Sequence, residues 1–151
     1  MKDKVKILFI CHGNICRSPM AEFVMKDMVK KAGLDWKFEI ASAATSTEEL
    51  GNPVHRGTRE KLRQVGISCA GKTARQMNRR DYDEYDYLIG MDRYNMRNME
   101  RICGGDPEGK LRKLLSRDVA DPWYTGNFED TYRDVMEGCT ALLEELRTEI
   151  Y

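Results

Sequence analysis

The chain has 151 residues, the size of one ordinary domain, and we expect residues 1–151 to form a single unit around one core. Hydrophobic residues make up 41% and charged residues 33%, a balance typical of globular proteins and unlike that of disordered or membrane-embedded chains. The 25 basic and 25 acidic side chains are interleaved and cancel, so we expect no nucleic-acid partner, and any phosphate site must be local.

The cysteines and the N-terminal segment indicate where the protein resides. The apolar run at residues 7–11 is too short for a signal peptide or a membrane span. Five cysteines, at positions 11, 16, 69, 103 and 139, are odd in number and scattered, as expected of reduced thiols. We therefore expect a cytoplasmic protein with no membrane partner.

The first predicted elements are a strand, a loop and a helix. Residues 5–10 are almost continuously apolar, which is typical of a strand buried on both faces of a parallel sheet. A glycine-containing turn follows. Ser18 is a candidate N-cap, Pro19 suits the first position of a helix, and Gly33 ends the apolar periodicity.

The rest of the chain continues to alternate between strands and helices. The pattern predicts strands at 38–42, 85–90 and 111–115, and helices at 58–65, around 96–102 and at 128–150. This order favours an α/β fold, a three-layer sandwich whose central parallel sheet has about four strands. The loop between the first strand and the first helix would then bind phosphate, because ligands of such folds bind at the carboxyl ends of strands.

Residues 11–19 of this loop carry the chemistry. The N-terminus of the following helix is an anion site, and Gly13 relaxes the backbone limits on a loop whose N–H groups converge on one anion. Arg17 can hold two phosphate oxygens at once. Cys11 lies at the centre of this cradle, where the same donors favour the thiolate that can attack phosphorus.

A metal site in the same loop is an alternative reading of these residues. Cys11, His12 and Cys16 lie close together in the sequence, but the paired spacing that completes a tetrahedral zinc site is missing. We expect no metal and no cofactor.

The sequence here resembles a known family. Cys-x5-Arg-Ser is the signature of cysteine-dependent phosphatases, and the string from Cys11 to Pro19 looks like that of low-molecular-weight protein tyrosine phosphatases. Segments at 42–46, 74–76 and 121–124 follow in the family's order. The resemblance implies hydrolysis of phosphotyrosine and small aryl phosphates through a phosphocysteine intermediate, with phosphotyrosine-containing proteins as substrates and phosphate or other oxyanions in the site.

The resemblance also implies roles for individual residues. Cys11 would be the nucleophile, Arg17 the phosphate clamp and Asp121 the general acid. The phosphate-binding loop would comprise the residues that follow the nucleophile, namely His12, Gly13, Asn14, Ile15, Cys16 and Ser18, and its shape would be held by Asn14, Ser18 and Ser42. The substrate pocket would be lined by Ile15, Glu48, Trp123 and Tyr124.

Two of these assignments also follow from chemistry. A departing phenolate needs a proton, which a carboxylic acid at Asp121 can donate and later recover from water. Trp123 and Tyr124 would form aromatic walls deep enough for a phosphotyrosine ring. Many relatives carry an aromatic residue where this chain has Glu48 and Glu49, so the pocket is expected to be more open and more acidic, which favours substrates with basic or neutral flanks.

Three alternative functions are open to the same sequence. A thiol-dependent arsenate reductase needs two further cysteines close together, and residues 80–94 contain none. A protein arginine phosphatase typically carries threonine where this chain has Ile15. A non-catalytic phosphopeptide-binding module would require neither Cys11 nor Asp121.

Cys16 suggests a redox hypothesis. A reactive thiolate at Cys11 would be oxidised first, and a neighbouring thiol could capture the sulfenic acid as a disulfide before irreversible oxidation. The sequence spacing does not establish that the two sulfur atoms meet.

Overall fold

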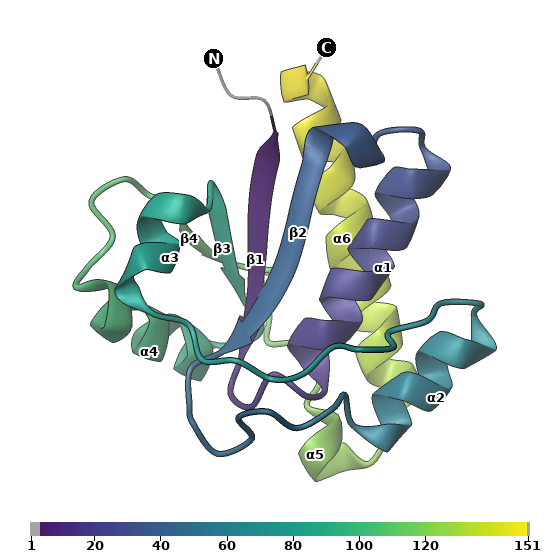
Figure 1. Cartoon of the computed structure of the whole chain (residues 1–151). Helices are drawn as coiled ribbons and strands as arrows, with labels where there is room; N and C mark the ends of the chain where they lie inside the picture. Colours follow the sequence, from purple (N-terminus) through teal and green to yellow (C-terminus); the bar gives the residue numbers. More distant parts are fainter. Residues whose placement is uncertain (1–3, 151) are drawn as a thin grey trace.

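A four-stranded parallel sheet forms the centre of the molecule (Figure 1). The computed structural model describes residues 4–150. The strands are β1 (Val5–Cys11), β2 (Phe38–Ala44), β3 (Tyr87–Gly90) and β4 (Leu111–Lys113), arranged in the order β2-β1-β3-β4. In this register Ile7 of β1 lies between Ile40 of β2 and Tyr87 of β3.

Helices cover both faces of this sheet, which gives three layers. The helices are α1 (Arg17–Lys31), α2 (Arg56–Gln64), α3 (Arg79–Glu84), α4 (Arg93–Cys103), α5 (Pro122–Thr125) and α6 (Phe128–Ile150), with a short 3-10 turn η1 (Asp35–Lys37). In Figure 1, α1 and α6 pack side by side on one face, and α3 and α4 lie on the other. The predicted α/β sandwich with a parallel sheet is therefore confirmed.

The unbroken apolar run of β1 is explained by burial on both sides. Ile7 and Phe9 belong to a core cluster with α1 and α6, whereas Leu8 and Ile10 belong to a second cluster with α3 and α4. Successive side chains of a strand point to opposite faces, so a central strand with a helix layer on each side must be apolar at every position. This buried strand fixes the position at which Cys11 leaves the sheet.

Three local features differ from the sequence-based predictions. Ser18 is not an N-cap, because α1 begins at Arg17 after a cap at Cys16, two residues earlier than the predicted start at Pro19. The short helices α3 and α5 were not predicted, since neither is long enough to show a helical repeat. A capping box that pairs Asn78 with Asp81 holds the start of α3, and this signal is readable in the sequence.

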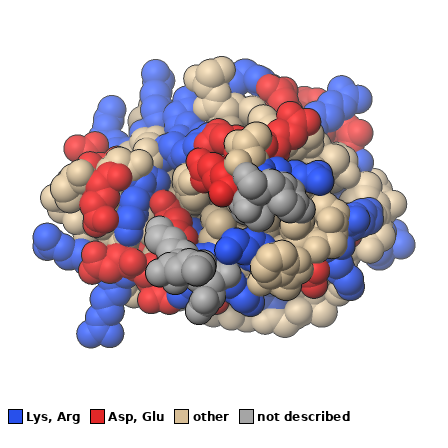
Figure 2. All heavy atoms as spheres, turned by 90° about the horizontal axis from the view of Figure 1, so that it is seen from above, with Lys and Arg blue, Asp and Glu red and all other residues tan. Residues whose placement is uncertain are grey.

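The two ends of the molecule differ in character. In Figure 1, β1 begins and α6 ends at one end, while the carboxyl ends of the strands and the loops that follow them lie at the other. Figure 2 views the first of these ends and shows acidic and basic side chains intermixed over it. Among the described residues, no helix is long and apolar enough to cross a membrane.

Candidate active site

The sulfur of Cys11 lies within a tight loop, residues 12–16, which joins β1 to α1. Cys11 Sγ accepts hydrogen bonds from the backbone N–H groups of Asn14 at 3.3 Å and Ser18 at 3.5 Å. The hydroxyl of Ser18 lies 3.0 Å from the same sulfur. Donors that converge on a sulfur favour its negatively charged form and reproduce the way such a loop surrounds an anion.

Asn14 holds this loop in shape from behind the sulfur. Its backbone is left-handed, with φ of 58°, a conformation that asparagine tolerates better than most residues. Its side-chain amide donates to Ser18 Oγ at 2.8 Å and to Ser42 Oγ at 2.9 Å, and its Oδ1 accepts from the backbone N–H of Arg75. Asn14, Ser18 and Ser42 are all buried, so water does not compete for these bonds.

A buried carboxylate extends this network. Ser42 Oγ donates to Glu22 Oε1 at 2.5 Å, and Glu22 is only 4% exposed. Lys26 pairs with Glu22 at 2.6 Å, and Lys72 lies 3.7 Å from it. Burial lowers the pKa of Lys72 below its ordinary value, although the charge of Glu22 acts in the opposite direction. Glu22 was not predicted from the sequence, because an acidic residue within a helix ordinarily faces solvent.

Arg17 is a buried guanidinium fixed by acidic partners. Its Nη1 donates to Asp92 Oδ2 at 2.9 Å and to the carbonyl of Val119, and its Nη2 lies 3.3 Å from Asp121 Oδ2. Burial acts to lower the pKa of Arg17, but the negative charges at Cys11, Asp121 and Asp92 leave it raised overall. The side chain therefore carries a permanent positive charge beside the sulfur.

Asp92 was also missed, although its position gives a signal. It lies two residues after β3, at the carboxyl end of the sheet, and caps α4 through a reciprocal pair of bonds with Asn95. Side chains at that edge of a parallel sheet commonly serve a site.

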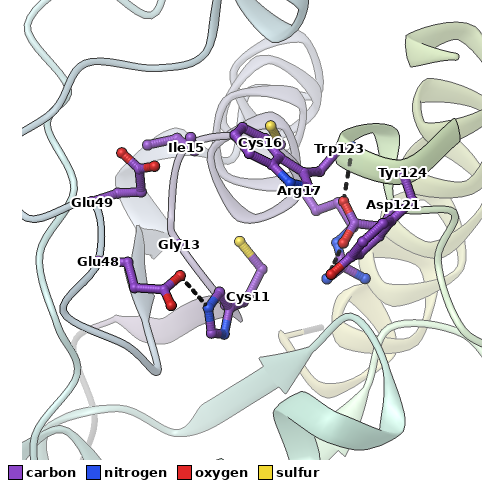
Figure 3. A pocket seen from close by; sticks show the side chains of 11 residues that line it. Cys11, Gly13, Ile15, Cys16, Arg17, Glu48, Glu49, Asp121, Trp123 and Tyr124 are labelled. Carbon is purple, nitrogen blue, oxygen red and sulfur yellow. Dashed lines mark hydrogen bonds and ion pairs between the residues drawn. The ribbon is translucent and has the colours of Figure 1, made fainter. Parts of the chain in front are cut away.

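Asp121 faces the sulfur from the opposite side of the pocket (Figure 3). It is the N-cap of α5, and its Oδ1 accepts from the backbone N–H of Trp123 at 3.1 Å. Pro122 occupies the first helical position, where the absence of an N–H has no cost. The carboxyl group is thus held by one backbone bond and by Arg17, and part of it remains open to the pocket.

These groups line one cavity of about 270 Å³. Trp123 and Tyr124 form an exposed wall beside Asp121, and Ile15 lies on the loop itself. Glu48 and Glu49 line the other side, and His12 Nε2 lies 2.7 Å from Glu48 Oε2. The residues predicted to line the substrate pocket, namely Ile15, Glu48, Trp123 and Tyr124, are therefore brought together. His12 joins its rim through its imidazole, a contact that we did not expect.

The remaining predicted residues lie around this cavity. His12, Gly13 and Cys16 line it together with Cys11 and Arg17, whereas Asn14, Ser18 and Ser42 do not line it and support the loop from the interior. Burial is the main cause that raises the pKa of Cys16 to about 12, and the charge at Cys11 adds to the effect. All five cysteines are unpaired thiols, and no cluster among the described residues groups three or more potential metal ligands.

A sulfur within an anion-binding loop, flanked by a fixed guanidinium and an opposing carboxyl group on a parallel α/β sheet, defines the cysteine-dependent phosphatases as a class. Comparison with known proteins agrees. The family model for low molecular weight phosphotyrosine protein phosphatase matches residues 6–150, and the chain belongs to this family.

Individual relatives are similar over nearly their full length. The low molecular weight protein-tyrosine-phosphatase YfkJ of Bacillus subtilis is 41% identical over 152 residues, covering 96% of this chain and 97% of the relative. The crystal structure of YfkJ superposes with a TM-score of 0.95, at 40% identity over 98% of each chain.

Two further solved structures are informative. The phosphatase SP-PTP of Streptococcus pyogenes is 41% identical with a TM-score of 0.87, covering 94% of this chain and 93% of its own. A Drosophila arginine phosphatase is 26% identical with a TM-score of 0.85, covering 94% of this chain and 98% of its own. The fold therefore accommodates more than one phosphoamino acid.

Proposed function

We propose that this protein hydrolyses phosphotyrosine, in proteins and in small aryl phosphates, through a phosphocysteine intermediate. The observation that carries the proposal is the convergence of the Cys11 sulfur, the Arg17 guanidinium and the Asp121 carboxyl group on one cavity. Each group matches one requirement of the reaction, namely a nucleophile, a neutraliser of phosphoryl charge and a proton donor.

In the first step, the Cys11 thiolate attacks phosphorus and the bond to the phenol oxygen breaks. Arg17 and the backbone N–H groups of the loop stabilise the charge on the phosphoryl oxygens. Asp121, in its carboxylic acid form, donates a proton to the departing phenol oxygen. Because its backbone bond to Trp123 fixes α5, the acid stays beside the wall that contacts the phenol ring.

In the second step, water attacks the phosphocysteine. Asp121, now a carboxylate, takes a proton from that water, and the phosphorus–sulfur bond breaks to release phosphate and the Cys11 thiolate. Ser18 supports both steps. Its Oγ accepts from Asn14, so its own hydrogen is available to stabilise the sulfur as leaving group.

The alternatives receive less support from the site. The arsenate reductase reaction would need further thiols at the pocket, but Cys69, Cys103 and Cys139 are buried and do not line it. Ile15 places an apolar side chain in the pocket, which suits a phenyl ring better than the polar guanidinium of phosphoarginine. A binding module would not need the Asp121 carboxyl group beside the sulfur.

The setting that we propose is the cytoplasm, with phosphotyrosine-containing proteins as partners. Five unpaired thiols are the observation in favour, since a reducing compartment preserves them.

The decisive experiment measures phosphate release from a phosphotyrosine peptide, a phosphoarginine peptide and an aryl phosphate with a strongly acidic phenol. We expect the phosphotyrosine peptide to be cleaved in preference to the phosphoarginine peptide. Cys11→Ser should abolish turnover while retaining phosphate binding, because a hydroxyl is hardly ionised at neutral pH. If the enzyme instead cleaved the phosphoarginine peptide in preference, the protein would be an arginine phosphatase and the proposal would be wrong.

Asp121→Asn tests the acid separately. We expect the rate for phosphotyrosine to fall about 10²–10⁴-fold, as general acid catalysis typically contributes, with a much smaller fall for the acidic phenol, which leaves without a proton. Equal losses with both substrates would show that Asp121 is structural.

A further inference from the structure

His55 connects the phosphate-binding loop to the start of α2. Its backbone N–H donates to the carbonyl of Ile15 at 2.8 Å, and its imidazole Nδ1 accepts from the backbone N–H of Gly57 at 3.0 Å, which makes it the N-cap of α2. Three residues on, the buried hydroxyl of Thr58 donates to the carbonyl of Cys16. The first turn of α2 is therefore bonded to the loop at two adjacent carbonyls.

The ring of His55 reaches the opposite wall of the pocket. It stacks on Phe128, the first residue of α6, with centroids 5.3 Å apart and planes 20° apart. It also meets the indole of Trp123 edge-on, at 6.1 Å and 78°. Gly57 makes this packing possible, because a Cβ there would lie 2.2 Å from the Phe128 ring. The imidazole of His55 thus contacts three helices: the backbone of α2, Trp123 of α5 and Phe128 of α6.

Trp123 has little other support. It is 62% exposed, and it belongs to a helix of four residues. A wall so weakly packed takes its orientation from the few groups that it touches. Its backbone N–H holds Asp121, so the same element also carries the carboxyl group.

We infer that His55 is a positioning residue for the aromatic wall: its imidazole sets the distance between Trp123 and Ile15, and so the width of the slot that receives the phenyl ring of the substrate. The inference rests on the proposed function, but it concerns recognition of the ring rather than the chemistry at phosphorus. The neutral ring must have its hydrogen on Nε2, since Nδ1 accepts from Gly57. No local sequence pattern marks His55 for this role, because its ring contacts join segments that are far apart in the chain.

Two variants separate the two functions of the side chain. His55→Asn keeps an oxygen that can cap α2 but removes the ring, whereas His55→Phe keeps the ring stack but removes the cap. We expect His55→Asn to raise KM for an aryl phosphate about three- to tenfold, the equivalent of one aromatic contact, with a smaller change in kcat. His55→Phe should keep KM within about twofold while lowering the melting temperature through loss of the cap.

Inhibition by inorganic phosphate provides the matched control. Phosphate occupies the loop but does not touch the wall, so its inhibition constant should be the same in the wild type and in His55→Asn. An unchanged KM in His55→Asn, or an equal loss of phosphate and aryl phosphate binding, would overturn the inference, since the latter would mean that the loop itself had been distorted.

A measurement that does not depend on catalysis can test the role of His55 even if the proposed phosphatase activity is wrong. The chain has two tryptophans, and Trp36→Phe leaves Trp123 as the only indole. In that background, fluorescence anisotropy of Trp123 should fall in His55→Asn, because the indole gains local motion, and should be preserved in His55→Phe. Unchanged anisotropy in His55→Asn would overturn the positioning role even if the enzyme were active.

Discussion

At the scale of single residues, the hydrogen bonds behind the nucleophile have a fixed direction. The Glu22 carboxylate can only accept, so Ser42 must donate to it and must accept from Asn14. Asn14 then donates one amide hydrogen to Ser42 and the other to Ser18. Ser18 is left to donate toward Cys11. A carboxylate that does not line the pocket thereby orients the hydroxyl that faces the sulfur.

We predict that Glu22→Gln lowers kcat about tenfold and destabilises the fold by about 1–3 kcal/mol, since a buried bond is lost and Lys72 loses an acidic partner. The side-chain amide of the introduced glutamine can donate to Ser42, which would reverse the direction of the hydrogen bonds that lead to Ser18. The rate and the urea midpoint should be compared with Glu60→Gln, which removes an exposed partner of Arg63. If Glu22→Gln had the same rate as Glu60→Gln, the hydrogen bonds from Glu22 to Ser18 would have no role in catalysis.

The redox hypothesis for Cys16 now has an electrostatic basis. Burial first, and the charge at Cys11 second, raise the pKa of Cys16 to about 12, which keeps its thiol protonated at neutral pH. Peroxide converts the Cys11 thiolate to a neutral sulfenic acid, which removes the contribution of the Cys11 charge to the raised pKa of Cys16. Attack by Cys16 on the sulfenic sulfur then forms a disulfide and releases water.

We predict that dithiothreitol restores activity after peroxide treatment in the wild type but much less in Cys16→Ser. Cys69→Ser, which changes a buried thiol that does not line the pocket, is the control and should recover like the wild type. Mass spectrometry of the loop peptide should show the bridge. If Cys16→Ser regained full activity and no bridged peptide were found, Cys16 would be only a packing residue.

At the scale of elements, α6 approaches the sheet closely at one point. Gly138 lies in the middle of this long helix, where alanine is ordinarily preferred by about 1 kcal/mol. Here a Cβ would lie 2.3 Å from Leu114 Cγ, in the segment that follows β4. Gly138 therefore allows α6 to pack closely against Leu114, and its role is not to make the helix flexible.

Gly138→Ala is accordingly predicted to destabilise the protein by about 1–3 kcal/mol, as overpacking does. In a Leu114→Ala background the same substitution should become neutral or stabilising, because the obstacle is gone and the preference of the helix for alanine remains. A urea double-mutant cycle measures both. Additive effects would show that the two residues do not meet.

Strands and long helices were largely predictable, because β1 is an almost continuous apolar run and the helical period extends over the whole of α6. The phosphate-binding loop was predictable since its residues are adjacent in the sequence. Glu22 and His55 were not, because each acts through contacts between segments far apart in the chain. The position of Asp92 after β3 marks it as a candidate, but its pairing with Arg17, 75 positions away, is not readable from the sequence. The pairing of Ser18 with the sulfur also outweighed its preference as a helix cap.

At the scale of the whole molecule, positive and negative charges balance, but those at the pocket do not. Glu48 and Glu49 line its rim, and Arg17 is the one permanently charged cation among the lining residues. A peptide that approaches this rim meets a negative field, which favours basic flanks and weakens with salt.

We predict a lower KM for phosphotyrosine peptides with lysine or arginine flanks than for those with acidic flanks, with a difference that shrinks as ionic strength rises. Glu48→Gln should reduce the preference, whereas Glu60→Gln should leave it unchanged. A preference for acidic flanks at low salt would contradict the argument.

Catalysis should need no metal, since Arg17 and the loop N–H groups supply the charge that stabilises the phosphoryl oxygens. We predict that activity is the same with and without EDTA at a concentration that fully inhibits a metal-dependent phosphatase assayed in parallel. Loss of activity that added Mg²⁺ or Zn²⁺ restores would contradict this.

The start of β1 and the end of α6 lie far from the pocket, and this placement has a practical consequence. Strand β1 begins and α6 ends at one end of the molecule, whereas the loop that follows β1 and the helix α5, which carry lining residues of the cavity, lie at the other (Figure 1). A fusion partner, an affinity tag or a solid support attached at either end would stand behind the enzyme rather than over its mouth. Immobilised protein should therefore capture and process large phosphoproteins from a flowing mixture as readily as small aryl phosphates.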